Sequence, residues 1–200
     1  MVEPPPTARS RLRELVNPPM RADARRHYKA LLVAAEEAFT AHGPDASLDE
    51  IARNAGVGNA TLYRHFPTRR DLLVAVCIGE VEALCTLGER LQSHSHPGDA
   101  LRRWLRAYIE HVSSKGGLAT AFATGRRADS EFVSTCQDVV QSVGSALLGN
   151  AQRDGAIRTD VDIADVITLV NAIAMAAEAK GVRGATRLLE LVLSGIARRD

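Results

Sequence analysis

The sequence predicts an all-α protein, and three observations support this fold class. Apolar residues recur at three- and four-residue spacing in most segments, which is the pattern of amphipathic helices. Alanine, leucine and arginine dominate the 200 residues, whereas aromatic residues make up only 4%, and this composition favours helices. Glycine and proline stand mainly between the periodic segments, where helices end. We therefore expect an N-terminal three-helix domain over residues 21–75 and a C-terminal helical bundle over residues 76–200.

Residues 1–20 are expected to form a flexible tail. Pro4–Pro6 and Pro18–Pro19 exclude a continuous helix, although Ser10–Val16 could form one or two turns. A disordered, solvated tail is the simpler interpretation. The alternative is an arm that enters a DNA minor groove through its basic side chains. These are Arg9, Arg11 and Arg13.

Composition and charge limit the class of protein further. The N-terminal segment lacks the apolar stretch of a signal peptide, and no run of 18 apolar residues appears, so the sequence predicts a cytoplasmic protein that does not enter a membrane. The formal net charge is only +1, so charge alone does not suggest a nucleic-acid partner. Placement is more informative, because several basic residues cluster around one motif. They are Arg25, Arg26, Lys29, Arg64, Arg69 and Arg70.

The first helix of the N-terminal domain is predicted over Ala24–His42. Its apolar residues share one face at helical spacing, and Gly43–Pro44 ends it. They are expected to form a small core with apolar residues of the next segment. The residues on that face are Tyr28, Leu31, Leu32, Ala35 and Phe39.

The stretch Ser47–Asp71 holds the strongest motif in the chain. Ser47 is a good N-cap for a short helix with one apolar face, and Gly56 follows where a left-handed C-cap is needed. A second short helix is expected to begin near Gly58 and to bury Leu62 and Phe66. Its other side then presents small and hydrogen-bonding residues to solvent. Such a pair of short helices predicts a helix-turn-helix that binds the major groove of DNA.

A third helix is predicted from Thr68 to Leu91. Pro67 ends the second short helix, and Thr68 with Asp71 has the spacing of a capping box. Gly79 lies inside the predicted helix, where glycine is less favourable than alanine. This helix is expected to connect the DNA-binding domain to the rest of the chain.

These residues resemble the N-terminal domain of the TetR-like transcriptional regulators. The resemblance extends back to Arg25–Gly43, whereas the C-terminal part is similar only in length and helical character. The matching motifs are Ala55-Gly56-Val57, Ala60-Thr61-Leu62-Tyr63, His65-Phe66, Arg69 and Leu72. The resemblance implies a homodimeric regulator, most simply a repressor, that binds a palindromic double-stranded operator and is released by a small-molecule effector.

The predicted DNA contacts combine phosphate binding with base recognition. Ser47 can offer its hydroxyl and backbone N–H to a phosphate. Asn59 could pair bidentately with adenine, while Ala60 and the methyl of Thr61 suit a thymine methyl. The resemblance implies that Tyr63, His65 and Arg69 hold the DNA backbone. The full set is Ser47, Gly58, Asn59, Ala60, Thr61, Tyr63, Arg64, His65 and Arg69.

The middle of the C-terminal bundle is the predicted ligand-binding region. Helices are expected over Gly98–Ser114, over Leu118–Thr124, and from Asp129 or Ser130 to about Arg153. Apolar pockets between helices, edged by a few polar groups, are common ligand sites. The alternative is that each candidate only packs the core. The candidates are Trp104, Tyr108, His111, Phe122, Phe132 and Cys136, with Thr120 and Thr124 as further polar groups.

The last two predicted helices, Asp162–Lys180 and Val182–Arg198, are more apolar than one buried face requires. Two such helices from each of two subunits can form a four-helix bundle, so the sequence predicts a two-fold dimer. The resemblance implies the same interface.

Catalytic residues, metal sites and cofactors are not predicted. His94 and His96 have no nearby ligands to complete a tetrahedral site. The three cysteines lack a CxxC spacing and are most simply reduced. No serine or cysteine motif accompanies His111, which argues against an enzyme. The remaining alternative is a DNA-binding dimer that has no effector.

Overall fold

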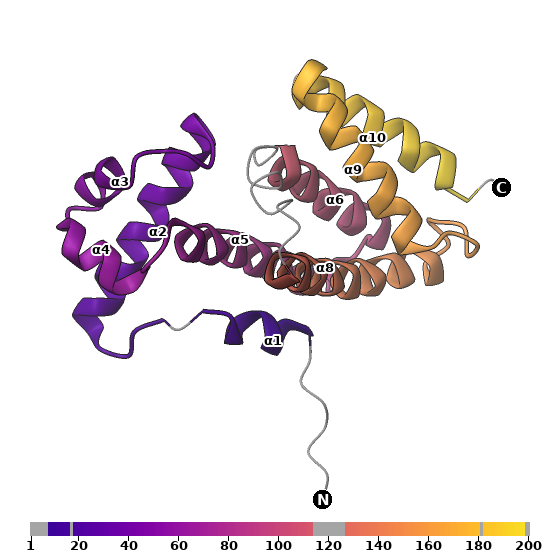
Figure 1. Cartoon of the computed structure of the whole chain (residues 1–200). Helices are drawn as coiled ribbons and strands as arrows, with labels where there is room; N and C mark the ends of the chain where they lie inside the picture. Colours follow the sequence, from indigo (N-terminus) through magenta and orange to yellow (C-terminus); the bar gives the residue numbers. More distant parts are fainter. Residues whose placement is uncertain (1–7, 17, 114–126, 181, 199–200) are drawn as a thin grey trace, which may run out of the picture. The chain divides into compact units, whose positions relative to one another are not determined.

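The computed structural model describes residues 8–16, 18–113, 127–180 and 182–198, and these parts form helices without a strand. The predicted all-α fold class is confirmed. No described helix is long and apolar enough to span a membrane. The helices labelled in Figure 1 are α1 (Ala8–Glu14), α2 (Ala22–His42), α3 (Leu48–Asn54), α4 (Asn59–His65), α5 (Arg69–Leu91), α6 (Pro97–Ser113), α8 (Arg127–Arg153), α9 (Ile163–Lys180) and α10 (Val182–Ile196).

The chain divides into two compact units. The first lies within residues 1–80 and 117–136, and the second within residues 81–116 and 137–200. Helices α5 and α8 therefore contribute residues to both. The predicted functional boundaries, at residues 20 and 75, remain predictions, because compact packing alone does not assign a function to a segment.

Three helices of the first unit, α2, α3 and α4, surround a small apolar core. Helix α2 packs on α3, and α3 packs on α4. Ile51, Leu62 and Phe66 are buried together with the apolar face of α2, as the spacing predicted. The rings of Tyr28 and Phe66 lie 5.0 Å apart between their centroids. This core fixes α4 relative to α2 and leaves the other side of α4 in solvent.

Local signals set the ends of these helices as predicted. The Ser47 Oγ accepts a hydrogen bond of 3.3 Å from the Glu50 N–H at the start of α3. Gly56 follows α3 with a φ of 69°, a conformation that costs other residues free energy. At the start of α5, the Thr68 N–H donates to Asp71 Oδ2 at 2.9 Å and the Asp71 N–H donates to Thr68 Oγ1 at 3.2 Å.

Residues 8–14 form α1, in the segment where the sequence allowed one or two helical turns at Ser10–Val16. Leu12 has no exposed surface, so the helix is anchored by burial of an apolar side chain. The proline-rich segments on either side do not prevent this, because the helix has only seven residues and lies between them. Whether Arg9, Arg11 and Arg13 reach DNA stays a prediction.

The second unit is built around Trp104, which is fully buried. Its indole N–H donates to the Leu84 carbonyl at 3.1 Å. Two glycines make room for the ring: a Cβ on Gly88 would lie 3.2 Å from Trp104 Nε1, and one on Gly144 would lie 3.1 Å from Trp104 Cη2. Helix α9 packs on both α6 and α10, which completes this core.

Helices α8 and α9 differ in how well their starts were predicted. Asp162 caps α9, because its Oδ1 accepts a hydrogen bond of 2.7 Å from the Ala164 N–H. The prediction that Asp129 or Ser130 caps α8 is wrong, because the helix already begins at Arg127. Asp129 is instead buried, and its Oδ1 accepts a hydrogen bond of 2.6 Å from the Arg70 Nε–H. The predicted helix Leu118–Thr124 lies outside the described residues.

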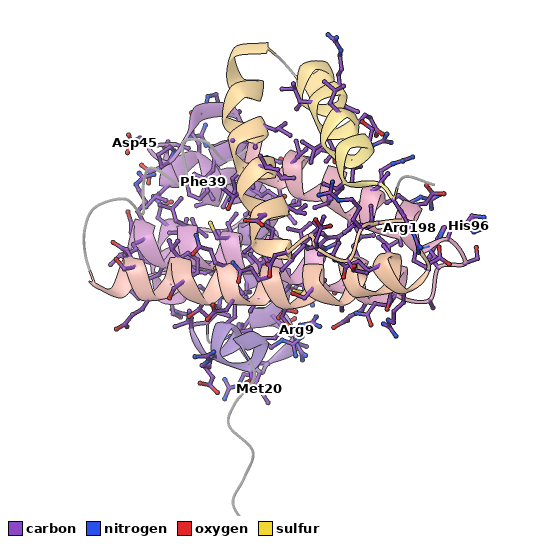
Figure 2. All side chains as sticks on the ribbon, turned by 90° about the vertical axis from the view of Figure 1, so that its right-hand side faces the viewer. Arg9, Met20, Phe39, Asp45, His96 and Arg198 are labelled. Atoms are coloured by element: carbon purple, nitrogen blue, oxygen red, sulfur yellow. The ribbon has the colours of Figure 1, made fainter. Side chains whose placement is uncertain are left out.

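Backbone contacts close the C-terminal end of the second unit. The Arg158 N–H donates to the Ile196 carbonyl, and the Arg198 N–H donates to the Ala156 carbonyl. His96 lies at the same end of the unit as Arg198 (Figure 2). Within the described residues, no group of three or more histidine, cysteine, aspartate or glutamate side chains could hold a metal ion.

Candidate nucleic-acid interface

The exposed side of α4 forms the candidate interface. Asn59, Ala60, Tyr63 and Arg64 are exposed, and Tyr63 retains 48% of its surface although it is aromatic. Thr61 is half-buried. Leu62 is 1% exposed on the opposite side, so the seven-residue helix is sharply divided between a buried and a solvent-facing side. This division presents polar side chains on a helix narrow enough to enter a major groove.

The start of α4 lies close to the start of α3. Asn59 Nδ2 donates a hydrogen bond of 2.7 Å to Asp49 Oδ1, and both side chains are exposed. The sequence predicted Asn59 as a base contact but missed Asp49. An aspartate in the first turn of a helix is favoured by the helix dipole alone, so its residue type gave no specific signal. The two residues are ten positions apart, so their proximity is apparent only once the two helices pack.

Arg69 has a structural role that the sequence did not predict. Its guanidinium is part-buried and donates from Nη1 to the carbonyls of Pro44, at 3.0 Å, and Ala46. These bonds connect the start of α5 to the loop between α2 and α3. A phosphate contact by the same side chain stays a prediction.

His65 is half-buried at the end of α4 and packs its ring edge against Tyr28, with centroids 5.9 Å apart. Burial, and then the nearby charges of His27 and Arg64, lower the pKa of His65 below its usual value. The lowered pKa favours the neutral ring, which has one N–H donor and one acceptor nitrogen.

The predicted ligand-binding residues fall in separate units. In the second unit, the rings of Trp104 and Tyr108 stack with centroids 5.8 Å apart, and Tyr108 stacks on His111 at 6.4 Å. The Tyr108 hydroxyl donates to Asn171 Oδ1 at 2.9 Å. Phe132 and Cys136 belong to the first unit. Phe122, Thr120 and Thr124 lie outside the described residues.

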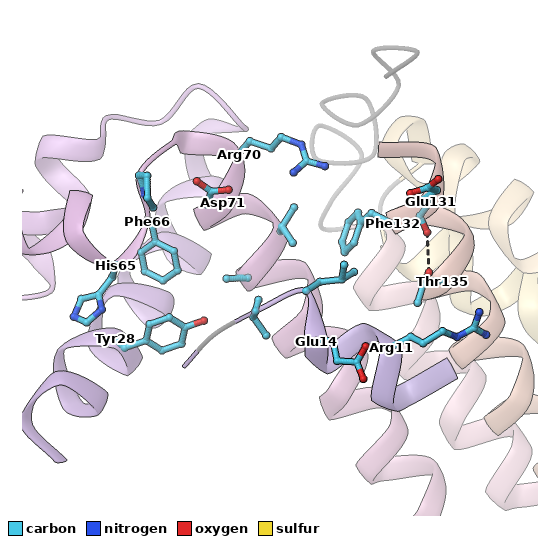
Figure 3. A pocket seen from close by; sticks show the side chains of 15 residues that line it. Arg11, Glu14, Tyr28, His65, Phe66, Arg70, Asp71, Glu131, Phe132 and Thr135 are labelled. Atoms are coloured by element: carbon cyan, nitrogen blue, oxygen red, sulfur yellow. Dashed lines mark hydrogen bonds between the residues drawn. The ribbon is translucent and has the colours of Figure 1, made fainter. Parts of the chain in front are cut away.

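A cavity of about 610 Å³ lies in the first unit and includes Phe132. Its walls come from α1, α2, the C-terminal end of α4 and the first turns of α5 and α8 (Figure 3). Tyr28 is 7% exposed, and its hydroxyl points into this space. His65 and Phe66 line the cavity from the end of α4, and Arg70 and Asp71 line it from α5. Sequence reasoning missed the cavity, because its walls come from five separate helices.

The caps, the left-handed glycine and the divided α4 define a helix-turn-helix DNA-binding protein. Two family models match the chain in agreement with this class. One, described as bacterial regulatory proteins of the tetR family, matches residues 31–76. The other, described as the C-terminal domain of SbtR-like transcriptional regulators, matches residues 96–198.

Solved and curated relatives are consistent with both matches. The structure is similar to the TetR transcriptional regulator SCO0520 from Streptomyces coelicolor, with a TM-score of 0.73 and 36% identity over 86% of this chain and 99% of that one. The sequence is 32% identical over 97 residues to the transcriptional repressor LfrR of Mycolicibacterium smegmatis, covering 48% of this chain and 51% of the relative. It is 33% identical over 84 residues to the transcriptional activator FasR of the same species, covering 41% and 38%.

The chain therefore belongs to the TetR family of DNA-binding transcriptional regulators. Its matches to the two curated relatives span about half of their length or less, so their particular activities are not assigned to it. The relatives named above are transcriptional regulators.

Proposed function

We propose that this protein is a ligand-responsive transcriptional regulator that binds a palindromic operator as a homodimer and is released by a small-molecule effector. The observation that supports operator binding best is the exposed side of α4. It presents Asn59, Thr61 and Arg64, which can hydrogen-bond or contact base edges, while Leu62 anchors the helix from behind. Chromosomal DNA as the target implies action in the cytoplasm.

Exposed apolar residues on the last two helices support the homodimer. Leu169 on α9 is 47% exposed and Leu191 on α10 is 58% exposed, although both helices also supply buried residues to the second unit. Apolar side chains on two neighbouring helices suit an isologous contact between two copies. Two helix-turn-helix units in such a dimer would bind half-sites related by two-fold symmetry.

Two places support a small-molecule effector. One is the Trp104–Tyr108–His111 stack of the second unit, where Trp104 itself is fully buried in the core. The other is the cavity beside α4, where the Tyr28 hydroxyl has no hydrogen-bond partner among the described residues. An effector with a hydrogen-bond acceptor could accept a hydrogen bond from the Tyr28 hydroxyl and would lie against His65 and Phe66. Binding there would couple directly to the position of α4.

The direction of regulation is proposed as repression. Release of a repressor needs only that the effector binds better to a state that does not fit the operator. The curated relatives include both a repressor and an activator, so a reporter assay with the selected operator decides between them.

Selection of genomic fragments by the purified protein, followed by footprinting, tests the proposed function. We expect protection of an inverted repeat whose half-sites lie about one turn of DNA apart. No enriched sequence at moderate salt would contradict operator binding. A compound that raises the melting temperature would argue against the alternative of a dimer without an effector.

Two substitutions separate positioning from recognition. Tyr63→Ala should weaken binding to every DNA sequence by a similar factor, because a backbone contact contains no sequence information. Asn59→Ala should change the preferred base at one operator position. Competition binding with a library of single-base operator variants measures both effects. Equal loss of affinity without a change of preference in both variants would contradict the role of Asn59.

A further inference from the structure

Asp49 and Asn59 form a polar pair at the predicted base-contacting end of α4. Asn59 Nδ2 donates to Asp49 Oδ1 at 2.7 Å, and neither side chain makes another hydrogen bond within the described residues. Both are exposed, so burial does not explain the pair. On the basis of the proposed function, we propose that Asp49 is a specificity-determining positioning residue that sets which base Asn59 selects.

The chemistry of the two groups fixes the orientation of the amide. A carboxylate only accepts hydrogen bonds, whereas an asparagine amide has a donor side and an acceptor side. The Asn59 amide must therefore turn its Nδ2 toward Asp49. One Nδ2 hydrogen is used, and the second hydrogen and Oδ1 remain for a base.

That remaining pair of groups matches adenine. Adenine presents the N7 acceptor and the N6 donor in the major groove, and asparagine binds them through one N–H and its carbonyl oxygen. Guanine presents two acceptors, N7 and O6, which the Asn59 Oδ1 cannot satisfy. Without Asp49, the Asn59 amide could rotate by half a turn without losing a hydrogen bond to Asp49. The preference of Asn59 for adenine over guanine would then be smaller.

Asp49 also places a negative charge on a surface that approaches DNA phosphates. A carboxylate there weakens the sequence-independent electrostatic part of binding. Asp49 thus lowers the sequence-independent affinity for DNA and increases the discrimination between bases. A residue with a purely structural role would not change the discrimination between bases.

Asp49→Asn tests the proposal, with Glu50→Gln as the matched control. Glu50 is the next residue, is exposed, and also lies in the first turn of α3, so its replacement removes an equal charge without changing the partner of Asn59. Both variants should bind DNA somewhat more tightly than wild type. Only Asp49→Asn should lower the preference for adenine at the Asn59 position, by about three- to tenfold. Competition binding with single-base operator variants measures this, and Asp49→Ala replaces Asp49→Asn if thermal unfolding shows that the latter is not folded.

Comparison with Asn59→Ala separates positioning from direct contact. In the Asn59→Ala background, Asp49→Asn should leave the base preference unchanged, because no amide remains to orient. An undiminished effect there would mean that Asp49 contacts a base itself, and would overturn the proposal. An unchanged preference in the single variant would overturn it as well. Both results leave the proposed function intact, whereas a wild-type protein without any sequence preference would overturn the function and the inference together.

Discussion

The two units of this protein are specified by different kinds of interaction. In the first unit, helices begin at polar signals that lie within a few residues of one another, such as the Ser47 cap of the short helix α3 and the Thr68–Asp71 box at the start of α5. In the second unit, helices surround one buried tryptophan, and glycines provide the space for it. Short helices with one exposed polar side gain little from packing and need their caps. The comparison explains why the helix-turn-helix of the first unit is recognisable from sequence and the packing of the second unit is not.

The largest expected effect comes from emptying the core behind α4. Leu62→Ala should lower the free energy of unfolding by about 2–5 kcal/mol, because a side chain that is 1% exposed leaves a cavity when it is truncated. DNA binding should be lost at physiological temperature. Trp104 is the sole tryptophan and belongs to the second unit, so its fluorescence reports on that unit alone.

If the units are stabilised separately, the Trp104 signal of Leu62→Ala should melt at the wild-type temperature while DNA binding is lost earlier. Val33→Ala is a suitable control, since Val33 is 58% exposed on α2 and its truncation should change neither measurement. Joint melting of both signals at a lower temperature would show that the two units are not stabilised separately, because the helices common to both transmit the loss.

Most of the first unit could be predicted because its signals are local. The N-cap, the left-handed glycine and the capping box each involve residues less than five positions apart, and all three were confirmed. Asp49 and Asn59 are ten residues apart, and Arg70 and Asp129 are 59 residues apart. Such contacts depend on how helices pack, which periodicity does not determine.

The positions of the candidate ligand residues likewise depend on how the helices pack, which the sequence pattern does not determine. Aromatic residues in neighbouring predicted helices suggested one pocket, but Trp104 fills a core and Phe132 lines a cavity in the other unit. The sequence allowed one or two helical turns at Ser10–Val16, but nothing in it indicates which surface buries Leu12. The spacing of apolar residues identifies a buried face but not its partner.

A smaller effect on stability is expected from replacing glycines of α5, and its sign should differ between Gly88 and Gly79. Gly88→Ala places a Cβ 2.2 Å from Val143 Cγ1. This overpacking should lower the free energy of unfolding by about 1–3 kcal/mol. The better helix propensity of alanine should offset up to about 1 kcal/mol of that loss. A Cβ on Gly79 would meet no atom of the described part of the chain within 4 Å, so Gly79→Ala should instead stabilise α5 by up to about 1 kcal/mol. Urea unfolding followed by circular dichroism measures both. Stabilisation by Gly88→Ala would show that Val143 can move aside and that the core of the second unit is less tightly packed than we infer.

The smallest effect concerns the histidine at the end of α4. Because burial lowers the pKa of His65 in the folded protein, the unfolded chain binds more protons, and stability should fall as the pH drops from about 7.5 through the unfolded pKa of about 6.5. Solvent screening limits the loss to less than about 1 kcal/mol, which is a change of less than about 4 °C in melting temperature. His65→Gln should remove this part of the pH dependence, whereas His42→Gln, at the exposed end of α2, should retain it. An identical pH profile for wild type and His65→Gln would mean that the protonated ring is accommodated next to Tyr28 without cost, and that the end of α4 is more open to solvent than its packing indicates.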